Sequence, residues 1–186
     1  MNEQIELELK NLLNNRYSTS ESTRGNYARG EDTYDPILSK AVVFPETNEE
    51  VSKILSLCNE HKIPVVPFGT GTSLEGNVVG NEKGITISLE KMNKILSVNV
   101  EDFDCRVQAC VTKEQLNDYL REDGVFFPID PGANAAIGGM ASTSASGTMA
   151  VKYGTMKTVI SGLTVVLPNG DIIKTGGRTK KTSAGY

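Results

Sequence analysis

A long run of small residues limits what the second half of this chain can fold into. The segment FPIDPGANAAIGGMASTSASGT, residues 127–148, consists mainly of Gly, Ala, Ser and Thr. It offers little apolar side chain for a hydrophobic core, but its backbone can lie flat against a large ligand. A shorter segment of this kind, VVPFGTGTSLEGN at residues 65–77, begins with an apolar stretch. Two such loops, each after a strand, predict a long ligand clamped between two sub-layers.

The shorter segment has the glycine content of a nucleotide-binding loop but matches neither of the two common motifs. Gly71 and Gly76 have the spacing of a Walker loop, but Asn77 and the following valine stand where Lys and Ser or Thr are required. A Rossmann fingerprint needs a third glycine at the start of a helix, and Leu74 occupies that position. We therefore exclude both motifs.

A third interpretation of this loop allows phosphate binding without a lysine or a helix. Glycine adopts positive φ easily, so Gly69 and Gly71 can turn successive backbone N–H groups inward as a nest for an anion. The hydroxyl groups of Thr70, Thr72 and Ser73 add further donors. A pyrophosphate would suit this nest. From this segment alone, a glycine-rich surface loop between two strands is an equally good interpretation.

The rest of the sequence predicts an α+β fold with two sub-layers. An early β-α-β order gives way to a part that is richer in hairpins. The polar stretch 14–35 is predicted to be a loop or a weakly ordered arm. The predicted helices span residues 2–13, 47–60 and 112–121, and the predicted strands span residues 41–44, 65–68, 85–89, 95–100, 105–111, 159–167 and 172–175.

Local signals mark the ends of several of these elements. The sequences TNEE at 47–50 and TKEQ at 112–115 are capping boxes, in which the threonine hydroxyl accepts an N–H and the fourth side chain reaches back. Gly124 is expected to end the second capped helix. The Asn-Gly pair within residues 168–171 predicts the turn of a β-hairpin.

Composition excludes several classes of protein. A net charge of −4 argues against an extended nucleic-acid surface. The longest apolar runs fall far short of the roughly 18–20 residues that a membrane span requires. The N-terminal sequence MNEQIELELK lacks a signal-peptide core and an arginine-rich transit pattern. Cys58, Cys105 and Cys110 are an odd number without ligand spacing, which predicts buried thiols and a cytoplasmic protein.

The few candidates for catalysis or metal binding have simpler interpretations. His61, the one histidine, is expected at the C-terminal end of a helix, where a cation complements the helix dipole. No cluster of His, Cys or carboxylates has ligand spacing, so no metal site is predicted. The basic stretch Arg178-Thr-Lys180-Lys181 is expected in a solvated loop, and Asp130 is expected to fix a turn.

The two small-residue segments, together with YGTMKTVISGLTVVLPNGDIIKTGGRTKKTSAGY at residues 153–186, resemble a known family. They resemble the FAD-binding domain of the vanillyl-alcohol-oxidase and p-cresol-methylhydroxylase (PCMH) type. Within that type, the D-lactate dehydrogenase (cytochrome) and glycolate oxidase flavoprotein group is the most similar. The D-lactate branch is the closer of the two, because its pyrophosphate loop reads Pro-Phe-Gly-x-Gly-Thr-Ser-Leu-Glu-Gly.

This resemblance implies a domain division and a set of cofactor contacts. A helix and polar arm at 1–36 would precede a PCMH-type domain at 37–186, with subdomains at about 37–98 and 99–186. The pyrophosphate contacts would be Pro67, Phe68, Gly69, Thr70, Gly71, Thr72, Ser73 and Leu74. Pro131, Gly132, Gly138 and Gly139 would line the flavin and ribityl side, and Thr143, Ser144, Ser146, Gly147 and Gly154 would continue the wall towards the adenosine.

The chain departs from the family pattern at three places. The usual TRASGTNA reads TSASGTMA here, with Ser144 and Met149 in place of Arg and Asn. Some members attach FAD to a histidine in the first loop, and Thr72 occupies that place, so non-covalent FAD is expected. The family continues beyond SAGYD into another flavin-contacting strand and a substrate cap domain, so we expect an incomplete domain without catalytic residues.

The function implied by the resemblance is oxidation of a small 2-hydroxy acid, D-lactate or alternatively glycolate. A hydride would pass from the substrate to the flavin, and electrons would pass on to a cytochrome, quinone or flavoprotein. The alternative hypothesis is a non-catalytic, truncated flavin-binding fragment or apo scaffold. An open sheet edge would lower FAD affinity and favour a homodimer.

Overall fold

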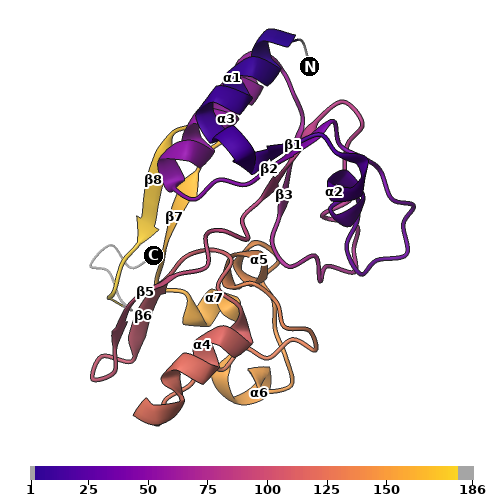
Figure 1. The fold of residues 1–186 in the computed structure, drawn as a ribbon. Helices are drawn as coiled ribbons and strands as arrows, with labels where there is room; N and C mark the ends of the chain where they lie inside the picture. Colours follow the sequence, from indigo (N-terminus) through magenta and orange to yellow (C-terminus); the bar gives the residue numbers. More distant parts are fainter. Residues whose placement is uncertain (1–2, 180–186) are drawn as a thin grey trace.

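Two packed units make up the part of the chain that the computed structural model describes, residues 3–179. The first unit is a four-stranded sheet with helices, and the second contains two-stranded sheets and short helices (Figure 1). This architecture confirms the predicted α+β class. Over residues 3–179, no helix has both the length and the apolar character that crossing a membrane requires.

A mixed sheet forms the centre of the first unit. Its strand order is β1-β2-β4-β3, in which β2, β4 and β3 are parallel and β1 is an antiparallel edge strand. The crossover through α3 therefore places β4 between the two strands that α3 connects. The elements of this unit are α1 (Glu3–Leu13), η1 (Asn14–Arg16), β1 (Tyr17–Ser18), α2 (Glu21–Asn26), β2 (Ala41–Val43), α3 (Asn48–Glu60), β3 (Val65–Phe68) and β4 (Ile85–Ser88).

The N-terminal helix α1 shares one hydrophobic core with α3 and the sheet. Ile5, Leu9 and Leu13 recur every four residues, so they lie on one face of α1, and all three are buried. The same core contains Ala41, Val43, Ile54, Cys58, Ile85 and Ile87. Each large aliphatic side chain buried in this way stabilises the fold by about 1.5–3 kcal/mol. The helix is therefore an integral part of the first unit.

The polar stretch 14–35 contains regular structure, so the prediction of a loop or weakly ordered arm is wrong. Strand β1 pairs with β2, and Ser20 caps α2 by accepting the N–H of Thr23. A two-residue strand and a six-residue polar helix carry no apolar periodicity that sequence reasoning can detect. Their stability comes from neighbouring elements, which only the folded chain brings near.

Both capping threonines are confirmed, and Glu50 also reaches back to the start of its helix, where the backbone N–H groups of Glu46 and Thr47 lower its pKa, whereas Gln115 does not reach back. Thr47 Oγ1 accepts the N–H of Glu50 at 3.1 Å, and Thr112 Oγ1 accepts the N–H of Gln115 at 3.2 Å. The Gln115 amide donates instead to the carbonyl of Asn93. The second box therefore lacks the hydrogen bond that its fourth side chain was expected to accept.

Glu50 is likewise drawn to a partner outside its helix. Its two carboxylate oxygens accept from Nη1 and Nη2 of Arg16, each at 2.6 Å, and Oε2 also accepts the N–H of Glu46. Arg16 in turn donates to the carbonyl of Phe44. This bidentate pair joins the turn after α1 to the start of α3. The hydrogen bond from Arg16 is the main reason why the pKa of Glu50 falls to about 2.

Within residues 3–179, two short hairpins, four α-helices and one 3-10 helix form the second unit. Its elements are β5 (Ile95–Asn99), β6 (Asp104–Val107), α4 (Lys113–Leu120), η2 (Arg121–Asp123), α5 (Ile137–Ser142), α6 (Ala150–Tyr153), α7 (Met156–Val159), β7 (Gly162–Val166) and β8 (Ile172–Gly176). Two predicted strands are shorter than expected. The strand predicted at 105–111 ends at Val107, and the strand predicted at 159–167 begins at Gly162, because helix α7 precedes it.

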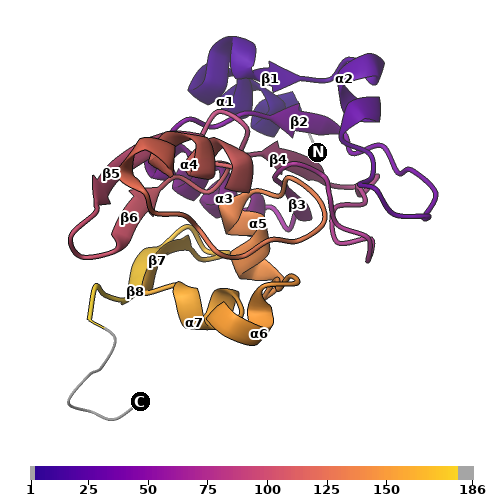
Figure 2. The ribbon, with the colours of Figure 1, turned by 90° about the horizontal axis from the view of Figure 1, so that it is seen from below.

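The long small-residue segment contains one short helix, α5, which packs together with the later helix α7 around a few larger side chains. Met140 and Met156 are buried together with Ile129, and this cluster holds α5 and α7 in place. In Figure 2, α5 lies between the first sheet and the β7–β8 hairpin. The sequence analysis predicts no helix here, because only three residues of this cluster are fully buried and they are widely spaced.

The turn of the β7–β8 hairpin docks on the first unit. The predicted Asn-Gly turn is confirmed, and Gly170 adopts φ of +93°, in the region that favours glycine. The Ser52 hydroxyl of α3 donates to the carbonyl of Gly170. A Cβ at Gly170 would lie 2.7 Å from the carbonyl oxygen of Ser52, so the turn and the helix are in close contact. The hairpin is therefore positioned by α3.

The Arg16–Glu50 pair predicts an acid-dependent loss of stability. Because the folded-state pKa of Glu50 is lowered to about 2 from 4.5, its contribution is present above pH 4.5 and is lost as the pH falls towards 2. Replacing Glu50 with Gln should lower the free energy of unfolding at neutral pH by about 1–2 kcal/mol, allowing for solvent screening. Urea titrations at several pH values measure this difference.

Glu49→Gln is the matched control, because Glu49 lies in the same helical turn but is exposed. That variant should unfold like the wild type at neutral pH. Equal stabilities of wild type and Glu50→Gln at neutral pH would contradict the assigned role of the pair.

Candidate cofactor site

The loop after β3 presents backbone N–H groups that no protein group uses. Within the described part of the chain, the N–H groups of Gly71, Thr72 and Ser73 have no protein acceptor. Gly71 has φ of +74°, the positive value expected for a residue that reverses the direction of a nest. These three donors fit an anionic group such as a pyrophosphate, which needs several convergent N–H groups.

The backbone conformation and the role of Gly69 differ from the prediction. The expectation that Gly69 also adopts positive φ is wrong, because Gly71 is the glycine of this pair in the left-handed region. A Cβ at Gly69 would lie 3.3 Å from Cβ of Ala136. Gly69 therefore allows the second small-residue segment to approach the end of β3, and its role is in packing rather than in turning the chain.

The two small-residue segments are joined by a direct hydrogen bond. The hydroxyl oxygen of Thr70 accepts the N–H of Ala136 at 3.3 Å and lies 3.4 Å from the hydroxyl of Thr72. Ala136 is the residue just before helix α5. The structure thus brings together two loops that are far apart in the sequence, as the prediction of a clamped ligand requires.

Both loops line one open cleft of about 3270 Å³ between the two units. Most of the predicted cofactor residues are on its wall: Pro67, Phe68, Gly69, Thr70, Gly71, Thr72, Ser73, Leu74, Pro131, Gly132, Gly138, Gly139, Thr143 and Ser146. Three predicted residues, Ser144, Gly147 and Gly154, are not on it. The same cleft is therefore lined by the nest of the first loop and by helix α5 of the second.

The three residues outside the cleft wall have roles within the protein. A Cβ at Gly147 would lie 2.3 Å from the carbonyl oxygen of Asp130, and a Cβ at Gly154 would lie 2.2 Å from the hydroxyl of Thr158. Gly154 and Ser144 also adopt positive φ. Their small size or unusual conformation is therefore explained by the turn geometry and packing of the loop.

The glycines on the cleft wall fall into two kinds. A Cβ at Gly138 would lie 2.8 Å from Cβ of Ala109, so close packing explains that glycine. Gly132 and Gly139 are exposed to the cleft, and a Cβ at either would meet no atom within 4 Å. Gly139 is helical, where Ala would be more stable by about 1 kcal/mol. Space left for a ligand explains Gly139 better than protein packing does.

Asp130 anchors the far end of the long loop. Its carboxylate accepts a hydrogen bond from the hydroxyl of Thr148 at 2.8 Å and another from the N–H of Met149 at 3.2 Å. These bonds, with the Thr148 hydroxyl contributing most, lower the pKa of Asp130. The sequence analysis assigns Asp130 to a local turn. Its actual partners lie 18 and 19 residues further along, and no local motif predicts that reach.

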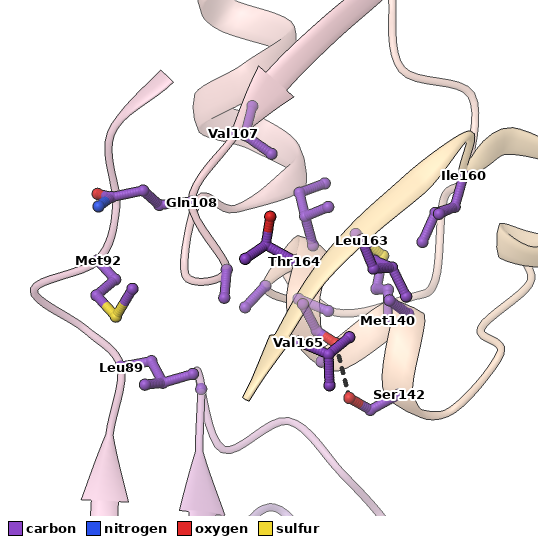
Figure 3. A pocket seen from close by; sticks show the side chains of 18 of the residues that line it. Leu89, Met92, Val107, Gln108, Met140, Ser142, Ile160, Leu163, Thr164 and Val165 are labelled. Carbon is purple, nitrogen blue, oxygen red and sulfur yellow. Dashed lines mark hydrogen bonds between the residues drawn. The ribbon is translucent and has the colours of Figure 1, made fainter. Parts of the chain in front are cut away.

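Apolar side chains form the wall of the cleft beyond the nest. Figure 3 shows Leu89, Met92, Val107, Leu163 and Val165 around this space, together with Met140 and Ile160 and the polar side chains of Gln108 and Thr164. The dashed line marks the hydrogen bond that Ser142 donates to the carbonyl of Gly138. A cleft with a polar nest at one end and apolar walls at the other fits a ligand that is anionic in one part and flat and apolar in another.

The cleft wall carries acidic side chains, among them Glu31, Glu75 and Asp104, and basic side chains, among them Arg106 and Lys174, but within residues 3–179 it carries no histidine. His61 ends helix α3, as predicted, and is not on the cleft wall.

Cys58 and Cys110 are buried, but Cys105 is exposed on strand β6 of a two-stranded hairpin, so the prediction of a buried thiol is wrong there. Burial raises the pKa of the Cys58 thiol to about 11 and also raises that of Cys110, and the pKa of Cys105 is raised as well, so all three thiols are protonated at neutral pH. Among residues 3–179, no group of His, Cys, Asp and Glu could hold a metal ion.

Arg178 forms two ion pairs, whereas the sequence analysis expects it in a solvated loop. It pairs with Asp102 at 2.5 Å and with Asp104 at 2.6 Å, although it stays exposed to solvent. These contacts join the end of β8 to the tip of the β5–β6 hairpin. The rest of the predicted basic stretch, Lys180 and Lys181, lies outside the described residues.

Comparison with known proteins identifies the family. A model described as an FAD-binding domain matches residues 39–176, which is most of the chain. The chain belongs to the FAD-binding domain family. This finding agrees with the unpaired N–H groups and the two open glycines of the cleft.

The relatives of this FAD-binding domain include several D-lactate dehydrogenases. It is 42% identical over 181 residues to the mitochondrial D-lactate dehydrogenase [cytochrome] of Arabidopsis thaliana, covering 96% of this chain and 32% of that protein. Over 148 residues it is 38% identical to the glycolate oxidase subunit GlcD of Bacillus subtilis, covering 78% of this chain and 32% of that protein. The domain thus spans about a third of the length of these relatives.

Solved structures show the same fold at low sequence identity. An alkyldihydroxyacetonephosphate synthase superposes with a TM-score of 0.85 at 23% identity, covering 96% of this chain and 36% of that chain. p-Cresol methylhydroxylase with substrate bound superposes with a TM-score of 0.69 at 24% identity, covering 93% of this chain and 35% of that chain. These comparisons confirm the predicted PCMH-type fold of the FAD-binding domain.

Gly139 provides a direct test of the cleft. Replacing it with Val adds a side chain where no protein atom lies, so the apo FAD-binding domain should still fold. The branched side chain would occupy space in the cleft, and FAD affinity should fall about tenfold or more, equivalent to about 1.4 kcal/mol. Flavin fluorescence titration gives the affinity, and thermal unfolding reports on the fold.

Gly25→Val is the matched control for this experiment. Gly25 also lies in a six-residue helix, and a Cβ there would meet no atom within 4 Å. Both variants carry the same helix-propensity cost, but Gly25 is not on the cleft wall. Unchanged FAD affinity of Gly139→Val, or an equal loss in Gly25→Val, would contradict the assignment.

Proposed function

We propose that this chain is the FAD-binding part of an FAD-dependent dehydrogenase of a small 2-hydroxy acid, D-lactate or alternatively glycolate. The family match and the identity to D-lactate dehydrogenases over 96% of the chain support the proposal. The structural observation that carries it is the row of N–H groups at residues 71–73, which have no protein acceptor within residues 3–179 and belong to residues on the wall of the same cleft as Gly132 and Gly139. One end of this cleft suits a pyrophosphate and the other suits a flat ring.

Different residues of the chain would bind different parts of FAD. The N–H groups of residues 71–73 would hold the pyrophosphate, with the hydroxyl groups of Thr72 and Ser73 as further donors. Gly132 and Gly139 would let the backbone lie close to the flavin and ribityl part, and Thr143 and Ser146 would line the wall towards the adenosine. When bound, FAD supplies the hydride acceptor for 2-hydroxy-acid oxidation and the route to a cytochrome, quinone or flavoprotein.

Binding without a covalent bond to the flavin follows from the side chains present in the two loops. Thr72 stands where a histidine would be needed for attachment, and neither loop contains a cysteine. The three cysteines elsewhere have raised pKa values, so they are poor nucleophiles at neutral pH. We therefore propose non-covalent FAD.

A second candidate is a non-catalytic flavin-binding unit or apo scaffold. Within residues 3–179, the cleft wall contains no histidine that could take up the hydroxyl proton of a substrate. Exposed apolar side chains on β7 and β8, among them Leu163, Ile172 and Ile173, support the homodimer that the sequence analysis expects. This candidate has the same cofactor site but no turnover.

A chimeric enzyme distinguishes the two candidates. We would replace the matching 32% of the Arabidopsis thaliana D-lactate dehydrogenase with this chain, which is 42% identical to it. The chimera should bind FAD, release it on acid precipitation and reduce an artificial electron acceptor with D-lactate or glycolate. L-lactate is the control for substrate selectivity.

The chimera that carries Gly139→Val should lose activity because it loses flavin. A folded, flavin-containing chimera that oxidises neither hydroxy acid would contradict the dehydrogenase proposal and favour the second candidate. Flavin that stays with the acid-precipitated protein would contradict non-covalent binding.

A further inference from the structure

The loop between α2 and β2 contacts the back of the candidate pyrophosphate nest. We call residues 27–34 the arm loop. The backbone N–H of Glu31 donates to the carbonyl of Gly71 at 2.9 Å. Gly30 lies directly behind this carbonyl, since a Cβ there would be 2.6 Å from the Gly71 oxygen and 2.9 Å from the Ser73 oxygen. The arm loop precedes the residues that the FAD-binding domain model matches, which begin at residue 39.

The Glu31–Gly71 hydrogen bond sets the direction of a neighbouring donor. In a trans peptide, the carbonyl of Gly71 and the N–H of Thr72 point in opposite directions because they share one plane. Holding the carbonyl against the arm loop therefore turns the Thr72 N–H away from it. A glycine at positive φ can otherwise exchange between several conformations, so an external contact is needed to select one.

An aromatic stack supports the same turn from a second side. The Tyr27 ring packs edge-to-face on Phe68, with ring centres 4.9 Å apart. The Phe68 ring in turn lies beneath Gly71, since a Cβ there would be 2.7 Å from its Cζ. Tyr27 also packs on Phe44 and donates its hydroxyl proton to the carboxylate of Glu90. The position of Gly71 thus depends on a ring that the arm loop supplies.

The arm loop is itself held in a fixed shape. Asp32 is only 7% exposed, and its carboxylate accepts the N–H of Gly30 at 3.1 Å and the N–H of Tyr34 at 3.0 Å. Further along, the Tyr34 ring lies against Gly76, where a Cβ would be 2.8 Å from it. The carbonyl of Ala28 accepts the N–H of Gly80 at 2.9 Å. The arm loop therefore follows the first cofactor loop from Gly71 to Gly80.

We propose that the arm loop is a positioning element for FAD, which fixes the peptide between Gly71 and Thr72 so that its N–H faces the pyrophosphate. This inference rests on the proposed FAD binding of the same cleft. Glu31 of the arm loop also lies on the cleft wall, but the proposed effect does not require an arm-loop residue to touch the cofactor. Their effect on affinity comes through the Gly71 carbonyl and the Phe68 ring.

Gly30→Ala tests the backbone contact. The added methyl group would overlap the Gly71 oxygen and push the peptide out of place, so FAD affinity should fall about tenfold or more. Gly25→Ala is the matched control, because it adds the same methyl group in α2 where no atom lies within 4 Å. Affinity is measured by flavin fluorescence, and thermal unfolding is measured on the same apo samples.

Two Tyr27 variants test the aromatic contact and keep the proposal testable if Gly30→Ala does not fold. Tyr27→Phe keeps the ring and loses only the hydroxyl, so FAD affinity should stay within about twofold of wild type. Tyr27→Leu removes the ring and should weaken binding about tenfold or more. In amide NMR spectra of the apo proteins, the Thr72 signal should shift in Tyr27→Leu and stay in place in Tyr27→Phe.

The outcomes separate this inference from the proposed function. A wild-type chain that binds no FAD overturns both. A wild-type chain that binds FAD, together with unchanged affinity in folded Gly30→Ala and Tyr27→Leu, overturns only the role of the arm loop. Loss of affinity in both variants, with Gly25→Ala and Tyr27→Phe unaffected, supports it.

Discussion

The contact between the two small-residue loops is the interaction on which the rest of the site depends. The N–H of Ala136 donates to the hydroxyl of Thr70, and Gly69 leaves room for Ala136 to approach. This contact lies on the cleft wall and joins the loop after β3 to the residue just before helix α5. Without it, the N–H groups of residues 71–73 and the open glycines would belong to separate surfaces, and no single ligand could reach both.

Charge and backbone contacts hold the two sides of this contact in place. The Arg16–Glu50 pair joins the turn after α1 to the first turn of α3, and α3 in turn holds the β7–β8 hairpin through Ser52. Asp130 ties the two ends of the long loop together. A site made largely of small residues has little side-chain packing of its own. Its rigidity is therefore supplied by neighbouring elements, which explains why the anchoring residues lie outside the cofactor loops.

Local sequence patterns predicted the parts of the fold that depend on local physics. The threonine caps of α3 and α4, the αL residue Gly124 and the Asn-Gly turn of the last hairpin follow from backbone geometry over a few residues. The wall of the cleft was also largely predictable, because the glycine and hydroxyl pattern of both loops is visible in the sequence. These features need no knowledge of distant contacts.

The features that sequence reasoning missed depend on contacts between distant residues. The strand β1 and helix α2 are too short and polar to show periodicity, and the small helices α5 to α7 form around the buried Met140 and Met156. The φ angle of Gly69 was predicted wrongly, because the residue is a glycine for its close contact with Ala136 of another loop. The hydrogen bonds of Asp130 with Thr148 and Met149 are also tertiary contacts, as is the bond between Glu31 and Gly71. No local motif predicts them.

The central claim is that one ligand, FAD, contacts both loops at once. Amide NMR spectra recorded during a titration with FAD test it most directly, because each N–H reports on its own surroundings. The account predicts that the signals of Thr72 and Ser73 in the first loop and of Gly132 and Gly139 in the second shift together, with one common affinity. FAD binding that shifts only one loop, or that shifts residues of α1 and α3 instead, would contradict it.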